Sequence, residues 1–201
     1  MANGKVCTGF SMPWVAKYAN NNGTVTYSGG IPLARGVDVS LSVESAGDNN
    51  FYADNVLAES DTQAFSSGTL SLTVDGLKQA AYKLITGVTT SQAVSFTGGT
   101  VTFDVWDDQA AVPYVGVGFV VRYMEAGVTT YVPVVLTKCA FQQLPMSAAT
   151  QGEDIDWQTT QLTAQILRGD DAKHSWKKAG LGGQSTESAA ENLIKAALDI
   201  S

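Results

Sequence analysis

The side chains that most often carry out acid–base and nucleophilic chemistry are few in this sequence. His174 is its only histidine, and Cys7 and Cys139 are its only cysteines. A Ser–His–Asp triad needs a positioned serine, and no Gly-x-Ser-x-Gly elbow occurs. A Cys–His pair would need one of the cysteines to reach His174, and neither lies in a recognisable motif. We therefore predict that His174 is solvated between Lys173 and Lys177, that both thiols are reduced and mostly buried, and that the protein is not an enzyme.

Carboxylates and glycines also lack the patterns of a cofactor site. Acidic residues gather at 107–108, 153–156 and 170–171, but none of these groups follows the spacing of a calcium-binding loop. The glycine pairs 98–99 and 182–183 lie outside the GxGxxG and GxxxxGK(S/T) contexts that hold phosphates. We expect no metal and no cofactor, and solvated turns at these positions.

The overall composition limits the classes of partner. Of the 201 residues, 44% are hydrophobic and only 15% are charged, and the net charge is −7. A chain so poor in charge favours burial of part of its surface in an assembly. The negative balance disfavours tight binding to nucleic-acid phosphates or to an acidic membrane surface. Neither a signal-like apolar N-terminus nor a run near the ~20 apolar residues of a membrane span occurs, so we expect a protein made and folded in the cytoplasm.

Two segments alternate between apolar and polar residues, the pattern of strands with one buried face. The apolar positions are Val37, Val39, Leu41 and Val43 in Gly36–Glu44, and Leu70, Leu72 and Val74 in Gly68–Asp75. Between the two strands, Ala46–Asn50 predicts a turn, and Phe51–Ser60 is expected to pair back on the first strand.

A short helix is expected after the second strand. Helical spacing over Leu77–Ile85 places one apolar stripe on it, formed by Leu77, Ala80, Ala81, Leu84 and Ile85. Asp75 can cap the N-terminus of this helix, and Gly87 is placed to end it. So short a helix is marginal alone, so it must pack on the sheet.

Other strands are expected on either side of this region. Met1–Ile31 is interpreted as irregular, with a turn at Asn20–Gly23 between two weakly strand-like pieces, and the tryptophans Trp14, Trp106, Trp157 and Trp176 as core anchors. Gly99–Trp106 predicts a strand with Val101, Phe103 and Val105 inward, and Asp156–Arg168 predicts a long strand. Tyr114–Met124 and Val128–Cys139 predict a hairpin, in which Gly116 and Gly118 leave one face bare and Pro133 indicates an edge or a bulge.

The C-terminal part differs in character. We expect a main β domain over residues 1–176, followed by a hinge and a helical extension over residues 177–201. The hinge is the glycine-rich run 180–183, and Ser188–Glu191 is a capping box that opens a helix to about Leu198. Such a helix needs a surface to dock on, either its own domain or a neighbouring copy. Its candidate latch residues are Leu193, Ile194 and Leu198.

The order of these elements resembles the core signature of the phage major tail proteins, the tail tube subunits of long, non-contractile-tailed phages and related prophages. The similar parts are a strand, the sequence FYADN at Phe51–Asn55, Phe65 and Gly68 opening a second strand, and a helix from Leu77 to near Gly87. Further along, Val115–Tyr123 with Tyr131–Phe141 resembles the family's hairpin, and Thr160–Arg168 matches its closing strand. The similarity covers most of Arg35–Arg168 and does not extend to the part from Lys177 onward.

The resemblance implies a mainly β, β-sandwich-like tail tube fold of antiparallel sheets with one flanking α-helix, to which the short C-terminal helix is added. It also implies that six subunits close into a ring, and that stacked rings form a hollow tube for passage of the viral DNA. By resemblance, the segment from Glu44 to Gly68 connects one ring to the next. Its candidate ring-stacking contacts are Glu44, Asp48, Asn49, Asn50, Phe51, Tyr52, Asp54, Asn55, Asp61 and Phe65.

The partners implied by the resemblance are further copies of the chain, a tape measure protein inside the tube during assembly, and tail tip and tail terminator proteins. DNA is expected to slide through the lumen without specific binding, no membrane is involved, and the protein is expected in the virion tail after assembly in the host cytoplasm. The main alternative is a secreted or surface β-rich domain of the pilin or adhesin type, which the missing signal peptide disfavours. A hydrolase on a β scaffold lacks a convergent acid, base and nucleophile.

Overall fold

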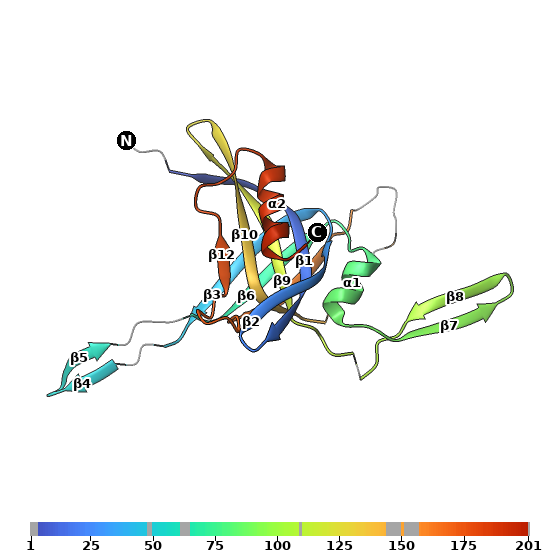
Figure 1. The fold of residues 1–201 in the computed structure, drawn as a ribbon, viewed down its shortest axis with the longest axis horizontal. Coiled ribbons are helices and arrows are strands. Elements are labelled where there is room, and N and C mark those ends of the chain that lie inside the picture. Colours follow the sequence, from blue (N-terminus) through green and yellow to red (C-terminus); the bar gives the residue numbers. More distant parts are fainter. Residues whose placement is uncertain are drawn as a thin grey trace.

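Antiparallel strands make up most of the protein in the computed structural model, which describes residues 4–47, 50–60, 65–108, 110–143, 150 and 157–200. Strands account for 56% of the residues and helices for 11%, so the predicted mainly β, sandwich-like class is confirmed. Figure 1 shows a central body of strands, with two hairpins that extend from opposite sides of it.

An 8-stranded antiparallel sheet forms the body, in the order β2–β1–β9–β10–β11–β6–β3, with β12 pairing beside β10. Two hairpins, β4–β5 and β7–β8, lie outside this sheet. The body strands are β1 (Val6–Asn21), β2 (Thr24–Pro32), β3 (Gly36–Ser45), β6 (Phe65–Val74), β9 (Val115–Glu125), β10 (Val128–Phe141), β11 (Thr160–Leu167) and β12 (Lys177–Ala179). The remaining elements are β4 (Asn50–Ala53), β5 (Val56–Ser60), β7 (Ser91–Phe96), β8 (Gly99–Asp104), α1 (Gln79–Thr86) and α2 (Glu187–Ala197).

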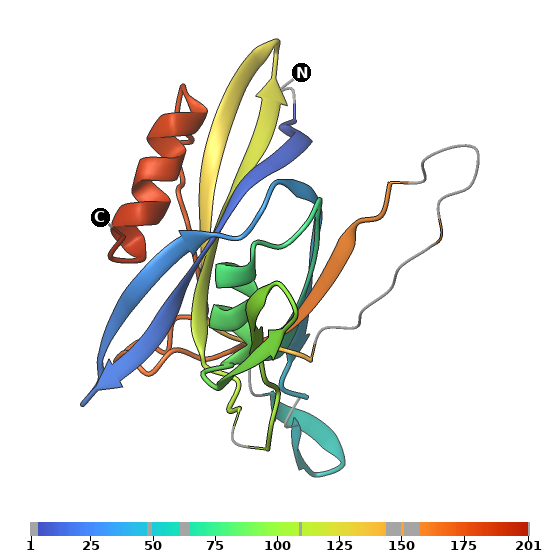
Figure 2. The same ribbon diagram turned by 90° about the vertical axis from the view of Figure 1, so that its right-hand side faces the viewer.

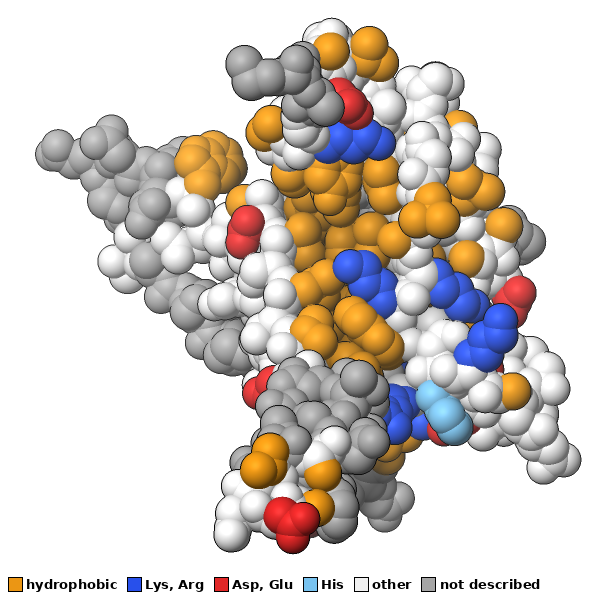
Figure 3. All heavy atoms as spheres, turned by 90° about the vertical axis from the view of Figure 1, so that its left-hand side faces the viewer, with side chains coloured by type: hydrophobic (Ala, Val, Ile, Leu, Met, Phe, Trp, Pro, Cys, Tyr) orange, Lys and Arg blue, Asp and Glu red, His pale blue; other side chains and the backbone are white. Residues whose placement is uncertain are grey.

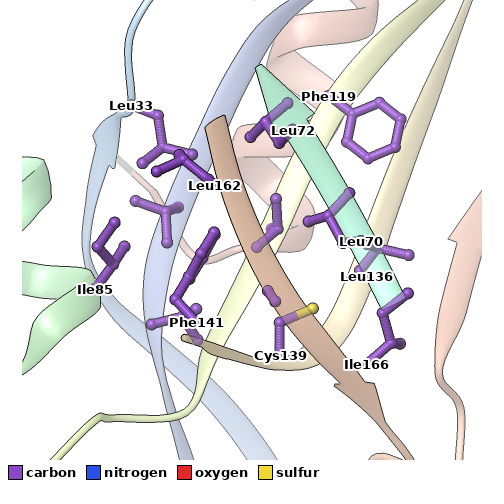
Figure 4. Close-up of a cluster of buried hydrophobic side chains, with 14 of the residues drawn as sticks. Leu33, Leu70, Leu72, Ile85, Phe119, Leu136, Cys139, Phe141, Leu162 and Ile166 are labelled. Atoms are coloured by element: carbon purple, nitrogen blue, oxygen red, sulfur yellow. The ribbon is translucent and has the colours of Figure 1, made fainter. Parts of the chain in front are cut away.

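The sheet folds over on itself around one main core. Strand β10 pairs with β11 only through Lys138–Phe141, and beyond that point β11, β6 and β3 lie opposite β1, β9 and β10 (Figure 2). The predicted alternation in β6 is confirmed, because Leu70, Leu72 and Val74 are all fully buried. Figure 4 shows these leucines meeting side chains from the opposite strands and from α1. The labelled core residues are Leu33, Leu70, Leu72, Ile85, Phe119, Leu136, Cys139, Phe141, Leu162 and Ile166.

Strand β3 is the outermost strand of the folded sheet, and its alternation is only partly realised. Val39 and Leu41 are half-buried against the core, whereas Val37 and Val43 are 56% and 46% exposed. The register shifts between Gly36 and Asp38, which removes Val37 from the inward row. The expectation that all four side chains face the core is therefore wrong at both ends of the strand.

The N-terminal segment is regular rather than irregular, as β1 spans 16 residues. Its pairing with β9 shifts register between Ser11 and Trp14, where Met12 has φ 51°. This bulge breaks the alternation that would have indicated a strand. The predicted turn is confirmed, with Asn22 and Gly23 both at positive φ between β1 and β2.

The β9–β10 hairpin forms as predicted, but Pro133 does not lie at an edge. On one side, Pro133 is opposite Val120 of β9. On the other side, its carbonyl accepts a hydrogen bond from the N–H of Gly180 at 2.9 Å, at the end of β12. Proline has no donor to offer, and the chain after Gly180 leaves the strand there before Gln184 pairs with Tyr131.

Helix α1 begins later than predicted. Its N-cap is Lys78, which makes no side-chain capping bond, and the carboxylate of Asp75 instead accepts from the backbone N–H of Arg35 at 2.9 Å and pairs with its guanidinium. Asp75 therefore links the end of β6 to Arg35, before β3, and does not cap the helix. The predicted end is confirmed, because Gly87 adopts φ 74° and donates to the carbonyl of Lys83.

Strand β11 is shorter than the predicted strand from Asp156, because it begins at Thr160. Trp157 precedes it and is 85% exposed, and Trp106 is 46% exposed, so neither is a core anchor. Trp176 is half-buried beside the main core, and Trp14 is half-buried beside a second cluster under α2. Asp156 lies outside the described residues.

Helix α2 docks on its own domain. Ile194 and Leu198 are fully buried against the outer face of the sheet, in a cluster that includes Ala16, Tyr27 and Val120. The bare face of β9 explains the docking, because a Cβ on Gly118 would overlap Ile194 and one on Gly116 would lie 2.7 Å from Leu198. Two of the three latch residues therefore already lie inside this copy.

The start of α2 also differs from the prediction. Thr186, rather than Ser188, is the N-cap, and its hydroxyl accepts from the backbone N–H of Ala189 at 3.3 Å. Strand β12 and α2 both pack on the main sheet, so residues 177–200 are an integral part of the body.

We predict that Ile194→Ala lowers the free energy of unfolding by about 2–4 kcal/mol, because it opens a cavity between α2 and the sheet. Leu193→Ala is the matched control, since Leu193 is 46% exposed on the same helix, and it should change stability only slightly. Urea denaturation followed by tryptophan fluorescence measures both. Equal losses for the two variants would contradict the docked position of α2.

Candidate assembly interface

The β7–β8 hairpin is a free-standing amphipathic element. The cross-strand pairs Val94–Val101 and Gln92–Phe103 place Val94, Phe96, Val101 and Phe103 on one face, where they are 42%, 60%, 46% and 54% exposed. The opposite face carries Ser91, Ala93, Ser95, Thr100 and Thr102. No charged residue occurs from residue 91 to residue 103.

This arrangement corrects the expectation that Val101 and Phe103 face the core. Sequence reasoning also missed β7, although Val94 and Phe96 alternate with polar residues just before the turn at Gly98. Alternation predicted the strand correctly, but it does not show what lies against the apolar face. Val105, beyond the end of β8, is half-buried, and its N–H donates to the carbonyl of Thr90 at 3.0 Å.

The base of this hairpin is fixed to α1. The carboxylate of Asp104 accepts from the ammonium of Lys83 at 2.7 Å and from the side-chain amide of Gln79 at 2.8 Å. The rings of Tyr82 and Trp106 also meet edge to face, with their centroids 5.3 Å apart. The Lys83 ammonium, and then the Gln79 amide, hold the pKa of Asp104 below its usual value. The hairpin therefore leaves the body at a defined place.

The FYADN segment forms the second hairpin, β4–β5. Its turn is Asp54–Asn55, at φ 52° and 64°, and the hairpin pairs only with itself. The expectation that Phe51–Ser60 pairs back on β3 is therefore wrong. The strands turn after Ala53 because both turn residues tolerate the left-handed conformation of a tight hairpin. In Figure 1 this hairpin extends from the side of the body opposite to β7–β8.

The predicted ring-stacking residues do not form one surface within this copy. Asp54 and Asn55 are exposed at the tip of β4–β5, and Asn50, Phe51 and Tyr52 supply the backbone of β4. Two other predicted residues, Glu44 and Phe65, belong to the body. Glu44 is exposed near the end of β3 and accepts from the hydroxyl of Ser67 at 2.9 Å, and Phe65 stacks on Trp176 with ring centroids 4.5 Å apart. Asp48, Asn49 and Asp61 lie outside the described residues.

The folded sheet has an open side where core-facing side chains reach the surface. We call it the seam, formed by Val39, Leu41 and Val43 of β3 together with Val121 of β9 and Val132 of β10. All except Val43 are half-buried at the margin of the main core, and Val43 is 46% exposed. Figure 3 views the body from the side away from β7–β8, and it shows hydrophobic side chains running down the middle of that side, with Lys and Arg side chains beside them.

One cluster of titratable groups joins separate strands of the body. Tyr18 donates its phenol hydrogen to the carboxylate of Asp170 at 2.9 Å, and Lys138 pairs with the same carboxylate at 2.8 Å. The ammonium of Lys138 also lies 4.6 Å from the ring centre of Tyr114. Lys138, and then the Tyr18 hydroxyl, lower the pKa of Asp170. This cluster fixes β1 and β10 to the loop after β11, and each of its polar groups already has a partner.

The two cysteines and the histidine differ in exposure. Cys139 is fully buried, and desolvation raises the pKa of its thiol, whereas Cys7 is exposed. The prediction of a buried thiol is therefore right for Cys139 and wrong for Cys7, and both are free. His174 is exposed as predicted, with its ring Nδ1 3.2 Å from the carbonyl oxygen of Gly169.

The part of the chain that the structure describes contains no group of three or more His, Cys, Asp or Glu side chains placed to hold a metal ion. Its helices are too short and too polar for any of them to span a bilayer.

Comparisons with known proteins give no family for the chain. None of the models of known protein families matches it, and a search of the curated proteins finds no relative.

We predict that the position of β7–β8 depends on the ionisation of Asp104. The folded pKa of Asp104 lies below its usual value, so its bond to Lys83 holds above about pH 4 and is lost as the pH falls through that lowered pKa. A spin label at Thr100→Cys, in a Cys7→Ser background, should become more mobile as the pH is lowered from about 5 to about 2. With Asp104→Asn added, the label should already be mobile at neutral pH. An unchanged spectrum in that variant would show that the contact does not fix the hairpin.

Proposed function

We propose that the protein is the major tail tube subunit of a long, non-contractile phage tail, in which six copies close into a ring and rings stack into a hollow tube for viral DNA. The observation that carries this proposal is the β7–β8 hairpin. Its four large apolar side chains all project from one face and are 42–60% exposed, and at the base Phe103 shares a shallow hollow with Tyr82 of α1. An exposed apolar face of this kind favours self-association over a monomeric state.

A two-stranded hairpin in water is marginal on its own, because each strand has one partner and neither face is covered. Covering the apolar face is worth about 25 cal/mol for each Å² removed from water, so four large side chains supply a substantial driving force. Contiguous apolar surface on a soluble protein typically marks an interaction site. The root at Asp104 and Lys83 presents this surface in a fixed direction, which reduces the entropy cost of association.

The two hairpins support separate roles in such an assembly. They leave the body on opposite sides, so one copy can contact different neighbours through each (Figure 1). In this proposal β7–β8 joins copies within a ring, and the segment around β4–β5 joins one ring to the next. The net charge of −7 also supports it, because an acidic tube repels DNA phosphates and lets the duplex slide.

We predict that the purified protein forms rings or tubes at high concentration, visible by negative-stain electron microscopy. Replacing the apolar face, in Val94→Thr/Phe96→Ser/Val101→Thr/Phe103→Ser, should abolish these assemblies and leave a folded monomer. The melting temperature of that monomer should be nearly unchanged, because the four side chains are exposed within one copy. The matched control is Ser95→Ala/Thr100→Ser/Thr102→Ser on the opposite face, which should still assemble.

The outcomes separate clearly. A wild-type protein that stays monomeric at every concentration, including with tail partners present, would overturn the proposed function. Rings that persist in the apolar-face variant would show that the hairpin is not the ring contact.

A further inference from the structure

The seam and the β7–β8 hairpin are complementary surfaces that a single copy cannot bring together. In Figure 1, β3 lies on the side of the body away from β7–β8, and Figure 3 shows hydrophobic side chains at the surface on that side. Both are apolar, and both are exposed or half-exposed in the isolated chain. A donor surface and an acceptor surface on opposite sides of one molecule give a head-to-tail contact, which can repeat from copy to copy.

We propose that the seam of each copy receives the apolar face of the β7–β8 hairpin from a second copy of this chain. This inference rests on the proposed function and identifies the two surfaces that meet. The apolar face of the hairpin in one copy then covers the seam of the next copy, from Val43 inward. The hydrophobic core of one copy then extends, through its seam, onto the hairpin of its neighbour.

Backbone pairing supports the same arrangement. Strand β3 ends the order of the main sheet, so its outer edge has no strand partner among the described residues. An exposed edge of this kind can accept an added strand, with main-chain hydrogen bonds holding it and side-chain alternation fixing which face points inward. The hairpin brings two regular strands whose outer edges are also free. Added beside β3, its apolar face continues the inward row of Val39 and Leu41.

Charged residues near the two surfaces favour one orientation of the hairpin in the seam. At one end of the seam Phe65 stacks on Trp176, the ammonium of Lys177 lies 5.9 Å from the Trp176 ring centre, and Arg168 donates to the carbonyl of Phe65 at 2.8 Å. Residues 91–103 of the hairpin are uncharged, and Asp108 is exposed just beyond its root, next to Asp107, whose carboxylate accepts from the hydroxyl of Thr90 at 3.0 Å. Seating residues 91–103 in the seam buries none of the charges of the hairpin, and it places the exposed Asp108 toward the basic end of the neighbour.

Other elements are less suited to the seam. Helix α2 already has its apolar face on the opposite side of the β9–β10 hairpin, with Ile194 fully buried. The exposed tip of β4–β5 is polar, at Asp54 and Asn55, and would place a carboxylate against aliphatic side chains.

The test is cross-linking between two different single-cysteine variants, each made in the full chain with Cys7→Ser. One carries Val43→Cys on the seam, and the other carries Phe96→Cys on the hairpin. They are mixed in equal amounts under assembly conditions and treated with a short bismaleimide. The buried Cys139 is common to both proteins and is controlled by the Cys7→Ser parent alone.

The matched control replaces Val43→Cys with Leu193→Cys, because Val43 and Leu193 are both 46% exposed but lie on different faces of the body. We expect the seam pair to give at least about tenfold more cross-linked dimer than the α2 pair, as the raised effective concentration of docked groups requires. Mass spectrometry of the dimer should show the linkage between residues 43 and 96.

The result also separates this inference from the proposed function. If tubes form but the seam pair cross-links no better than the α2 pair, the seam contact is wrong and the tube function stands. If the seam pair cross-links strongly in a protein that forms dimers or open chains and never rings or tubes, the contact is right and the function is wrong. If the protein neither assembles nor cross-links, both are overturned.

Discussion

The structure depends on one constraint, that an apolar sheet face must be covered by something. Within the body this is met by folding one sheet over on itself, so that Leu70 and Leu72 meet Phe119 and Leu136 from the facing strands. It is met again on the outer face, where Gly116 and Gly118 let α2 approach closely. The β7–β8 hairpin has a regular apolar face whose four large side chains stay 42–60% exposed. The constraint that builds the fold therefore also points to assembly.

Much of the fold is predictable from the sequence, for a physical reason. Where an element has its own turn and one buried face, local pattern and tertiary environment agree, as in β6 and in the β9–β10 hairpin with its turn at Ala126–Gly127. Gly87 ends α1 as expected, since few other residues adopt its left-handed conformation without strain. The close approach over Gly116 and Gly118 was also foreseen, because missing side chains leave room for something else.

The errors share a different cause, since they concern what an element packs against. Val101 and Phe103 alternate just as Leu70 and Leu72 do, yet one pair is exposed and the other fully buried. Alternation reports that a strand has an apolar face, and it carries no information about which chain covers that face. The bulge at Met12 and the Asp75–Arg35 tie were missed for a related reason, because each depends on contacts between segments rather than on local spacing. The candidate site was found only in part, as the FYADN hairpin but not as β7–β8.

The two faces of β9 and β10 differ in whether the chain itself covers them. Helix α2 covers the outer face of β9 and β10 from within the chain, so that face is closed to neighbours before assembly begins. The seam on the other side of the same strands stays open, with Val132 and Val121 only half-buried. A subunit with one closed face and one open face can associate in a single orientation, which keeps a head-to-tail contact from competing with face-to-face pairing.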